Sequence, residues 1–250
     1  MPASLMEGSL SSYTWSEKPG AGHGEAGGFH VTCNGQSGYA KPIRQGDGCP
    51  RAAHEKIASD LAFELGLPVP PVVLWNRQNA PNGCEQCCAI SAVPFQPAHR
   101  WAHIEAMPTT AATAARAISD QATAMSVFDT WLDNRDRHNH GNLLITLVGG
   151  SYSSAYIDYS FSLSYGWGEG EAPPPNGVPR YPVAPTADVA AAANTLRRIE
   201  QLEEATIRDV VSRVPGEYLK SSRQKAIADG LPKRRHGLRA AISAMYGSGV

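Results

Sequence analysis

The hydrophobic pattern changes its period near residue 95, and this change constrains the fold more than any other feature of the chain. Before that point, short segments alternate apolar and polar residues, as in residues 29–33, which is typical of strands. After it, apolar residues recur at helical spacing, as in residues 111–132. This order predicts an α+β chain with a sheet-rich first lobe over residues 1–95 and a mainly helical second lobe over residues 96–250.

In the first lobe, the local signals predict a small sheet with one helix. Asn34-Gly35 is a strong hairpin signal, and Pro42 indicates that the return strand ends there or lies at a sheet edge. Gly66 stands where the C-terminal cap of a helix belongs. The elements expected here are strands at residues 29–33, 38–43, 72–75 and 88–93 and a helix at 51–65.

The second lobe is predicted to be helical around one hairpin. A polar loop at residues 133–142 separates the first helix from an apolar strand, and Gly149-Gly150 supplies the hairpin turn. The elements expected here are helices at residues 111–132, 187–214 and 221–246 and strands at 143–148 and 154–158.

The polar loop holds the candidate catalytic groups. Asp136 and Asn142 lie in it, and Asp158 ends the strand opposite. A carboxylate that follows an apolar strand is costly to bury unless a cation or a metal ion partners it. Magnesium prefers hard oxygen ligands, and phosphoryl transfer needs such ligands together with a cation on the phosphates. Lys41 is the candidate for that cation.

Five motifs, in order along residues 28–245, resemble those of the HipA-like kinases, which belong to the protein-kinase-like and phosphoinositide-kinase-like superfamily. Each motif is short, and their common order carries the resemblance. The motifs are Tyr39-Ala40-Lys41, for the strand with the ATP-phosphate lysine; residues 53–70, for the first helix and its exit; Asp136-Arg137-His138 with Asn142-Leu143-Leu144-Ile145, for the catalytic loop; residues 157–163, for the metal-binding segment; and residues 214–219, for a late motif of small bacterial members.

The resemblance implies a bilobal protein-kinase-like fold and a kinase that uses ATP and Mg²⁺. The expected acceptor is a hydroxyl group, on Ser or Thr of a protein substrate. The change of period near residues 93–96 places the hinge there, where adenine would meet backbone groups. By this resemblance, Asp136 orients the acceptor hydroxyl, and Asn142 and Asp158 hold Mg²⁺. Lys41 contacts the ATP phosphates, and Glu55 orients Lys41. Val93, the first residue of the hinge, binds the nucleotide.

The catalytic loop departs from the family pattern by one extra residue. Asp136 and Asn142 are separated by one position more than is usual in the family, and the insertion is expected at Asn139 or His140. If the loop bulges, Asn142 still reaches the metal ion and His140 points to solvent; otherwise Asn139 takes its place. Arg137 is expected to form a structural salt bridge rather than to contact substrate.

Two other functions remain open. The inserted residue is compatible with a pseudokinase, which binds nucleotide without transferring phosphate. His138-Asn139-His140 spells a nuclease-like triplet, so a metal-dependent nuclease is a rival class. The next histidine after His140 is His236, which is far from the spacing that such a metal site needs.

Composition argues against several partners. The formal net charge is -1, and no apolar run is long enough to span a bilayer, so we expect neither a specific nucleic-acid partner nor a membrane partner. Residues 1–12 lack the features of a signal peptide, which favours a cytoplasmic protein. The odd number of cysteines, 5, favours reduced thiols over disulfides.

Two further segments have more than one interpretation. Residues 22–27 fit a glycine-rich lid over ATP phosphates, or equally a terminal linker. Lys233-Arg234-Arg235 is expected to be a solvated helix face rather than a site for an acidic partner or RNA.

Overall fold

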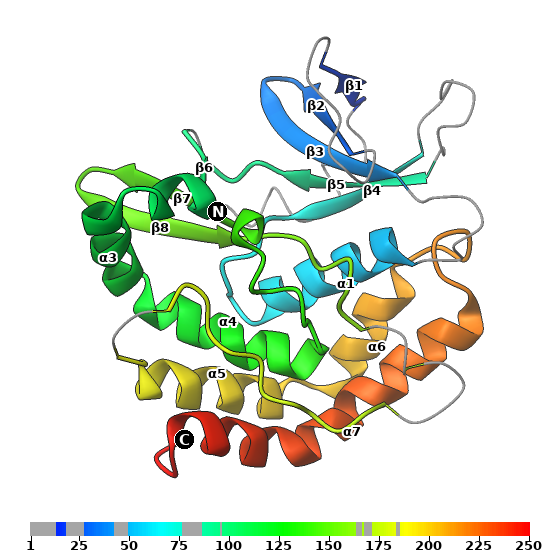
Figure 1. Ribbon diagram of the computed structural model, residues 1–250. Helices are drawn as coiled ribbons and strands as arrows, with labels where there is room; N and C mark the ends of the chain where they lie inside the picture. The colour runs from blue at the N-terminus through cyan, green and yellow to red at the C-terminus, as the bar shows by residue number, and fades with distance from the viewer. Residues whose placement is uncertain are drawn as a thin grey trace.

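The computed structural model places a five-stranded sheet above a group of helices (Figure 1). It describes residues 14–18, 28–42, 50–76, 87–95, 97–163, 167, 172–183 and 186–250. The predicted glycine-rich segment at residues 22–27, the end of the predicted hinge at Gln96, and Cys84 all lie outside these residues. Of the helices in the described part of the chain, none has a stretch long and apolar enough to cross a membrane.

The upper sheet is antiparallel throughout and has the strand order β1-β2-β3-β5-β4. Asn34 and Gly35 both have positive φ angles, 48° and 79°, as the predicted tight hairpin turn requires. β3 is described as far as Pro42, which pairs with Cys88 of β5, so the proline lies in an inner strand of the sheet. The strands are β1 (Ser16–Glu17), β2 (Phe29–Cys33), β3 (Gln36–Pro42), β4 (Val72–Asn76) and β5 (Cys87–Ala92).

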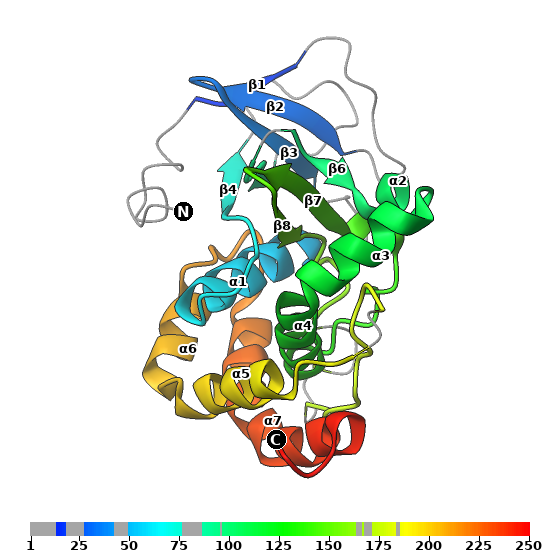
Figure 2. The same ribbon diagram turned by 90° about the vertical axis from the view of Figure 1, so that its left-hand side faces the viewer.

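Helix α1 (Arg51–Glu64) lies between the sheet and the lower helices (Figures 1 and 2). Gly66 ends it with a φ angle of 60°, and Leu67 N–H donates to the Ala62 carbonyl at 2.8 Å, the bond expected of a glycine cap. Ile57 and Leu61 of α1 belong to the same buried core as the side chains of the lower helices. Helix α1 is therefore packed into the helical region, although it precedes it in sequence.

The lower helices correct two predictions. The helix expected at residues 111–132 is two helices that meet at Ile118. One packs against β8 (Ser151–Tyr156), and the other packs against α5 and α7. The helix expected at residues 187–214 breaks at Leu202, because its second part turns to pack against α1 and α7. The helices are α2 (Trp101–Glu105), α3 (Pro108–Ala117), α4 (Ser119–Leu132), α5 (Val189–Gln201), α6 (Glu204–Ser212) and α7 (Ser221–Tyr246).

A second sheet of three strands, β6 (His99–Arg100), β7 (Leu143–Val148) and β8 (Ser151–Tyr156), carries the predicted hairpin. Gly149 and Gly150 make its turn with φ angles of 60° and 83°. β8 stops two residues short of Asp158, so the predicted strand at residues 154–158 was too long at its end. Strand β6, which pairs with β7, was not expected from the sequence.

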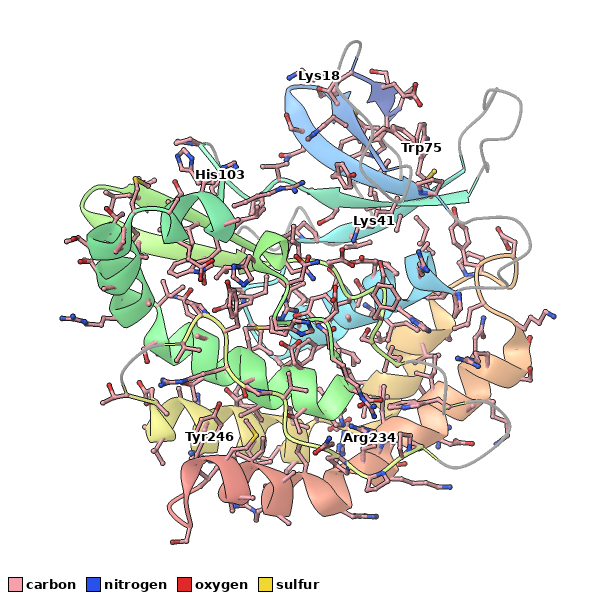
Figure 3. All side chains as sticks on the ribbon, viewed as in Figure 1. Lys18, Lys41, Trp75, His103, Arg234 and Tyr246 are labelled. Atoms are coloured by element: carbon pink, nitrogen blue, oxygen red, sulfur yellow. The ribbon has the colours of Figure 1, made fainter. Side chains whose placement is uncertain are left out.

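In the basic run of α7, Lys233 is exposed as predicted, but the prediction was wrong for Arg234. The Arg234 guanidinium is buried and donates to the carbonyls of Thr130 and Trp131, both at 2.7 Å. These carbonyls belong to the last turn of α4, whose C-terminal oxygens lack partners within their own helix. Figure 3 places Arg234 among the lower helices, far from Lys41. Arg234 therefore supports the helix that leads into the polar loop.

Candidate active site

Lys41 lies on β3, on the side of the sheet that faces the helices (Figure 3). Its Nζ atom is 2.6 Å from Glu55 Oε1 on α1 and 2.8 Å from Asp158 Oδ1 beyond β8. The predicted Lys41–Glu55 pair is present, and the structure adds Asp158 to it. One lysine thus joins three segments that are far apart in the sequence.

Lys41 and Asp158 each stabilise the charged form of the other. Burial alone would lower the pKa of Lys41, but the charges of Glu55 and Asp158 raise it above its ordinary value. Burial alone would raise the pKa of Asp158, but the charge and hydrogen bond of Lys41, with hydrogen bonds from Ser160, hold it below its ordinary value. At neutral pH the lysine is therefore a cation and Asp158 an anion.

Asp136 and Asn142 face each other across the polar loop. Asn142 Nδ2 donates to Asp136 Oδ2 at 2.9 Å and to the Asp136 carbonyl at 3.2 Å. Asn142 is buried, whereas Asp136 is partly exposed. The Asp136 carboxylate is thus held by the loop and still reachable from solvent.

The extra loop residue is accommodated in a short turn. Residues His140–Asn142 form one turn of 3-10 helix, and the Asn139 side chain caps it by accepting from Gly141 N–H at 3.0 Å. His140 is exposed, as expected, and contacts the Glu105 carboxylate. Asn139 is therefore occupied by the turn, and Asn142 is the amide that meets Asp136.

Arg137 is buried beneath the loop and fixes its geometry. The guanidinium bonds both carboxylate oxygens of Asp129, at 2.6 and 3.2 Å, as the predicted structural salt bridge. It also donates to the carbonyls of Asn142 and Ile157, both at 3.0 Å. Ile157 N–H in turn donates to the Asn142 carbonyl at 3.0 Å. Asn142 and Asp158 are therefore brought to the same end of the β7–β8 hairpin.

The backbone groups of Val93 both have partners within the protein. Its N–H donates to the Ser37 carbonyl at 2.9 Å, which continues the pairing of β3 with β5. Its carbonyl accepts from the Gln36 side chain, whose Nε2 lies 3.1 Å away. The role of Val93 in binding the nucleotide stays a prediction.

A HipA-like kinase family model matches residues 23–172, which is more than half of the chain. The chain belongs to the HipA-like kinase family. No curated protein sequence matches it. A crystal structure of the Helicobacter pylori proinflammatory kinase CtkA superposes with a TM-score of 0.63 at 14% sequence identity, covering 94% of this chain and 96% of that one. At this identity the match shows a shared kinase-like fold.

The oxygen atoms of this HipA-like kinase site fit magnesium. Asp158 offers a carboxylate and Asn142 an amide oxygen, which are hard ligands. Within the described ranges, no three His, Cys, Asp or Glu side chains gather to form a metal cage. Mg²⁺ usually takes only one or two protein carboxylates and leaves its other positions to phosphates and water. The donor set therefore matches an ion that arrives with a nucleotide.

The histidines of the loop do not converge on a metal site. His138 Nδ1 lies 3.1 Å from the Arg135 carbonyl, so this ring braces the loop. His140 turns to Glu105 on α2 and packs against the Tyr181 ring at 5.3 Å. Each imidazole has its own structural partner, which disfavours the nuclease interpretation of the triplet.

Sequence reasoning missed two groups that shape this HipA-like kinase site. Asp129, the partner of Arg137, is fully buried, and a single carboxylate among the apolar residues at the end of α4 was its signal. Ser160 lies inside the segment that resembles the family's metal-binding motif, but nothing in the pattern singled it out. Its contacts depend on how α1 packs, which no local pattern reveals.

Proposed function

We propose that the chain is an ATP- and Mg²⁺-dependent kinase that transfers the γ-phosphoryl group to a Ser or Thr hydroxyl of a protein. The observation that carries this proposal is the meeting of Lys41, Glu55 and Asp158 beside the Asp136–Asn142 pair. A cation, metal-binding oxygens and an accessible carboxylate are the groups that phosphoryl transfer requires. Membership of the family supports the same reaction.

Each residue has a separate task in the proposed reaction. Asp136 accepts a hydrogen bond from the acceptor hydroxyl and aligns it for attack, since its carboxylate is fixed by Asn142 and remains reachable. Asn142 and Asp158 would hold Mg²⁺, which neutralises charge on the phosphates when bound. Such positioned charges matter because the transfer needs little covalent chemistry from the protein.

Lys41 would contact the ATP phosphates. Its side chain is 23% exposed and contacts Asp158, whose side chain is 27% exposed, so both side chains are partly open to a ligand. Because Val93 has no free N–H and Pro94 has none at all, we propose Phe95 as the next backbone donor to adenine. The nucleotide would then bind where residues 1–95 meet residues 96–250, the two lobes of the proposed domain division.

The first test is incubation of the purified chain with labelled ATP and Mg²⁺ and with candidate acceptor proteins. Mass spectrometry then identifies phosphorylated Ser or Thr. Glu204→Gln, an exposed carboxylate change on α6, serves as the control variant. Labelled product that forms with Mg²⁺ and is absent with EDTA supports the proposal. ATP binding without any transfer would indicate a pseudokinase, and plasmid nicking without ATP binding would indicate a nuclease.

A further inference from the structure

Ser160 uses each of its polar groups on a different partner. Its hydroxyl donates to Glu55 Oε1 at 2.9 Å, and its N–H donates to Asp158 Oδ1 at 3.3 Å. Its carbonyl lies 3.3 Å from His54 Nδ1, which must carry a proton to bond it. Ser160 is buried, so water does not compete for these bonds. One side chain and its peptide groups thereby link α1 to the segment beyond β8.

These bonds close a ring with the lysine. Lys41 contacts Glu55 and Asp158, and Ser160 contacts the same two acids from the other side. Glu55 Oε1 accepts from both Lys41 Nζ and Ser160 Oγ. The ring runs from β3 to α1 to the segment after β8, so a shift of any one of these elements disturbs the other two.

The backbone at Asp158 is shaped to place Ser160. Asp158 has a φ angle of 64°, a left-handed conformation that few residues other than glycine adopt. Aspartate tolerates it because its side chain can accept from the N–H two residues later, and here that N–H belongs to Ser160. The same turn that aims the Asp158 carboxylate at Lys41 therefore directs the Ser160 hydroxyl at Glu55.

We propose that Ser160 is a positioning residue for the phosphoryl transfer, an inference that rests on the proposed function. Phosphates compete with Asp158 for Lys41, because they are anions that must approach the same ammonium group. Glu55 is a buried carboxylate, and a buried charge with too few donors is costly. The Ser160 hydroxyl keeps one donor on Glu55 while Lys41 turns to the phosphates. Glu55 thereby stays in place and continues to orient the lysine.

Ser162 provides a matched control. It lies two residues further on, is fully buried, and its hydroxyl donates to the Tyr159 carbonyl at 2.7 Å, outside the ring. Ser162→Ala removes a buried hydroxyl from the same segment without touching Lys41, Glu55 or Asp158. A general loss of packing or hydrogen bonding in this segment would therefore appear in both Ser160→Ala and Ser162→Ala.

The test compares kcat and KM for ATP·Mg²⁺ in the wild type, Ser160→Ala, Ser160→Thr and Ser162→Ala. We expect Ser160→Ala to lower kcat/KM about tenfold, since it removes a hydrogen bond to a charged group. Ser160→Thr keeps a hydroxyl and should retain more activity than Ser160→Ala. Ser162→Ala should stay within about twofold of the wild-type kcat/KM. Equal kcat/KM in Ser160→Ala and the wild type would overturn the proposal.

A double-mutant cycle separates this inference from the proposed function. Ser160→Ala and Glu55→Ala, each of which removes the bond between the two side chains, are combined, and denaturant unfolding of the four proteins measures whether their effects on stability add. Non-additive effects support the ring of contacts whether or not the wild type transfers phosphate. A wild type that transfers no phosphate would contradict only the kinase proposal. If the wild type is an active kinase and the effects of the two substitutions on stability are additive, the proposed role of Ser160 is wrong.

Discussion

Two ion pairs near the polar loop, Arg137–Asp129 and Lys41–Asp158, differ in how far their side chains are exposed. Arg137 and Asp129 have side chains only 2% and 0% exposed, and the guanidinium is committed to a carboxylate and two carbonyls. Lys41 and Asp158 are 23% and 27% exposed. The first pair is buried scaffold, whereas the second offers its charges to a ligand. Burial thus separates the arginine that holds the loop from the groups that we propose to contact the nucleotide.

The aromatic rings near Arg137 reinforce this difference. Its guanidinium lies 5.0 Å from the Tyr159 ring centre and 5.4 Å from that of Tyr156, within cation–π range. Burial alone would lower the pKa of Arg137, but the charge of Asp129 raises it. The arginine therefore stays charged although water is excluded, and its loss would leave Asp129 as a buried anion without its partner.

Breaking the scaffold pair should have the largest effect. Arg137→Ala should lower the free energy of unfolding by about 3–5 kcal/mol, because it strands a buried carboxylate. Denaturant titration measures this change. Arg208→Ala, which removes an exposed arginine whose partner Asp229 is partly exposed, should change stability by no more than about 1 kcal/mol. Similar losses of unfolding free energy in the two variants would show that the buried Arg137–Asp129 pair is no more important for stability than an exposed pair.

Breaking the open pair should instead affect nucleotide binding. Lys41→Ala should weaken ATP·Mg²⁺ binding by about tenfold or more, and Glu55→Gln by less, since the glutamate acts through the lysine. Asp158→Asn should weaken binding mainly when Mg²⁺ is present. Calorimetry with and without the metal measures all three. Wild-type affinity in Lys41→Ala would show that the lysine assignment is wrong.

Acid should act first through a buried histidine. Burial lowers the pKa of His54 to about 4, below its ordinary value of 6.5. The unfolded chain then binds a proton that the folded chain refuses, so stability falls as pH drops from about 6.5 to about 4. The expected loss over this window is about 3 kcal/mol. His54→Gln should flatten the profile in denaturant titrations at several pH values. An unchanged slope would contradict the buried neutral histidine.

The smallest effect is expected at Asn139, one of the two candidate positions for the inserted residue. Asn139→Ala removes only the cap of a short turn and should cost about 1 kcal/mol or less, with transfer activity nearly unchanged. Asn142→Ala removes a proposed metal ligand and should lower activity strongly. Transfer assays on both variants decide between them. Activity that survives the loss of Asn142 but not that of Asn139 would reverse the assignment.

Local signals explain what the sequence could predict. Asn34-Gly35, Gly66 and Gly149-Gly150 set turns and caps through their own backbone preferences, and each turn is where it was expected. The apolar strands at the hairpin likewise carry their pattern within a few residues. The segments that bear Lys41 and Asp158 could therefore be placed from the amino-acid sequence alone.

What the sequence could not predict depends on tertiary packing. The breaks at Ile118 and Leu202 arise because neighbouring helices pack on different partners. The bond from Ser160 to Glu55 joins residues 105 positions apart, and only the docking of α1 creates it. The bond from the Val93 N–H to the Ser37 carbonyl follows from the register of β3 on β5, which a one-residue slip would change.

The most direct test of the proposed mechanism is Asp136→Ala, assayed in parallel for ATP·Mg²⁺ binding and for phosphoryl transfer. Asp136 lies on the open side of the loop and contacts Asn142, but it takes no part in the Lys41 cluster. Its loss should lower the transfer rate by on the order of 10²–10³ or more and leave the nucleotide affinity nearly unchanged. A variant that transfers phosphate as fast as the wild type would contradict the proposed mechanism.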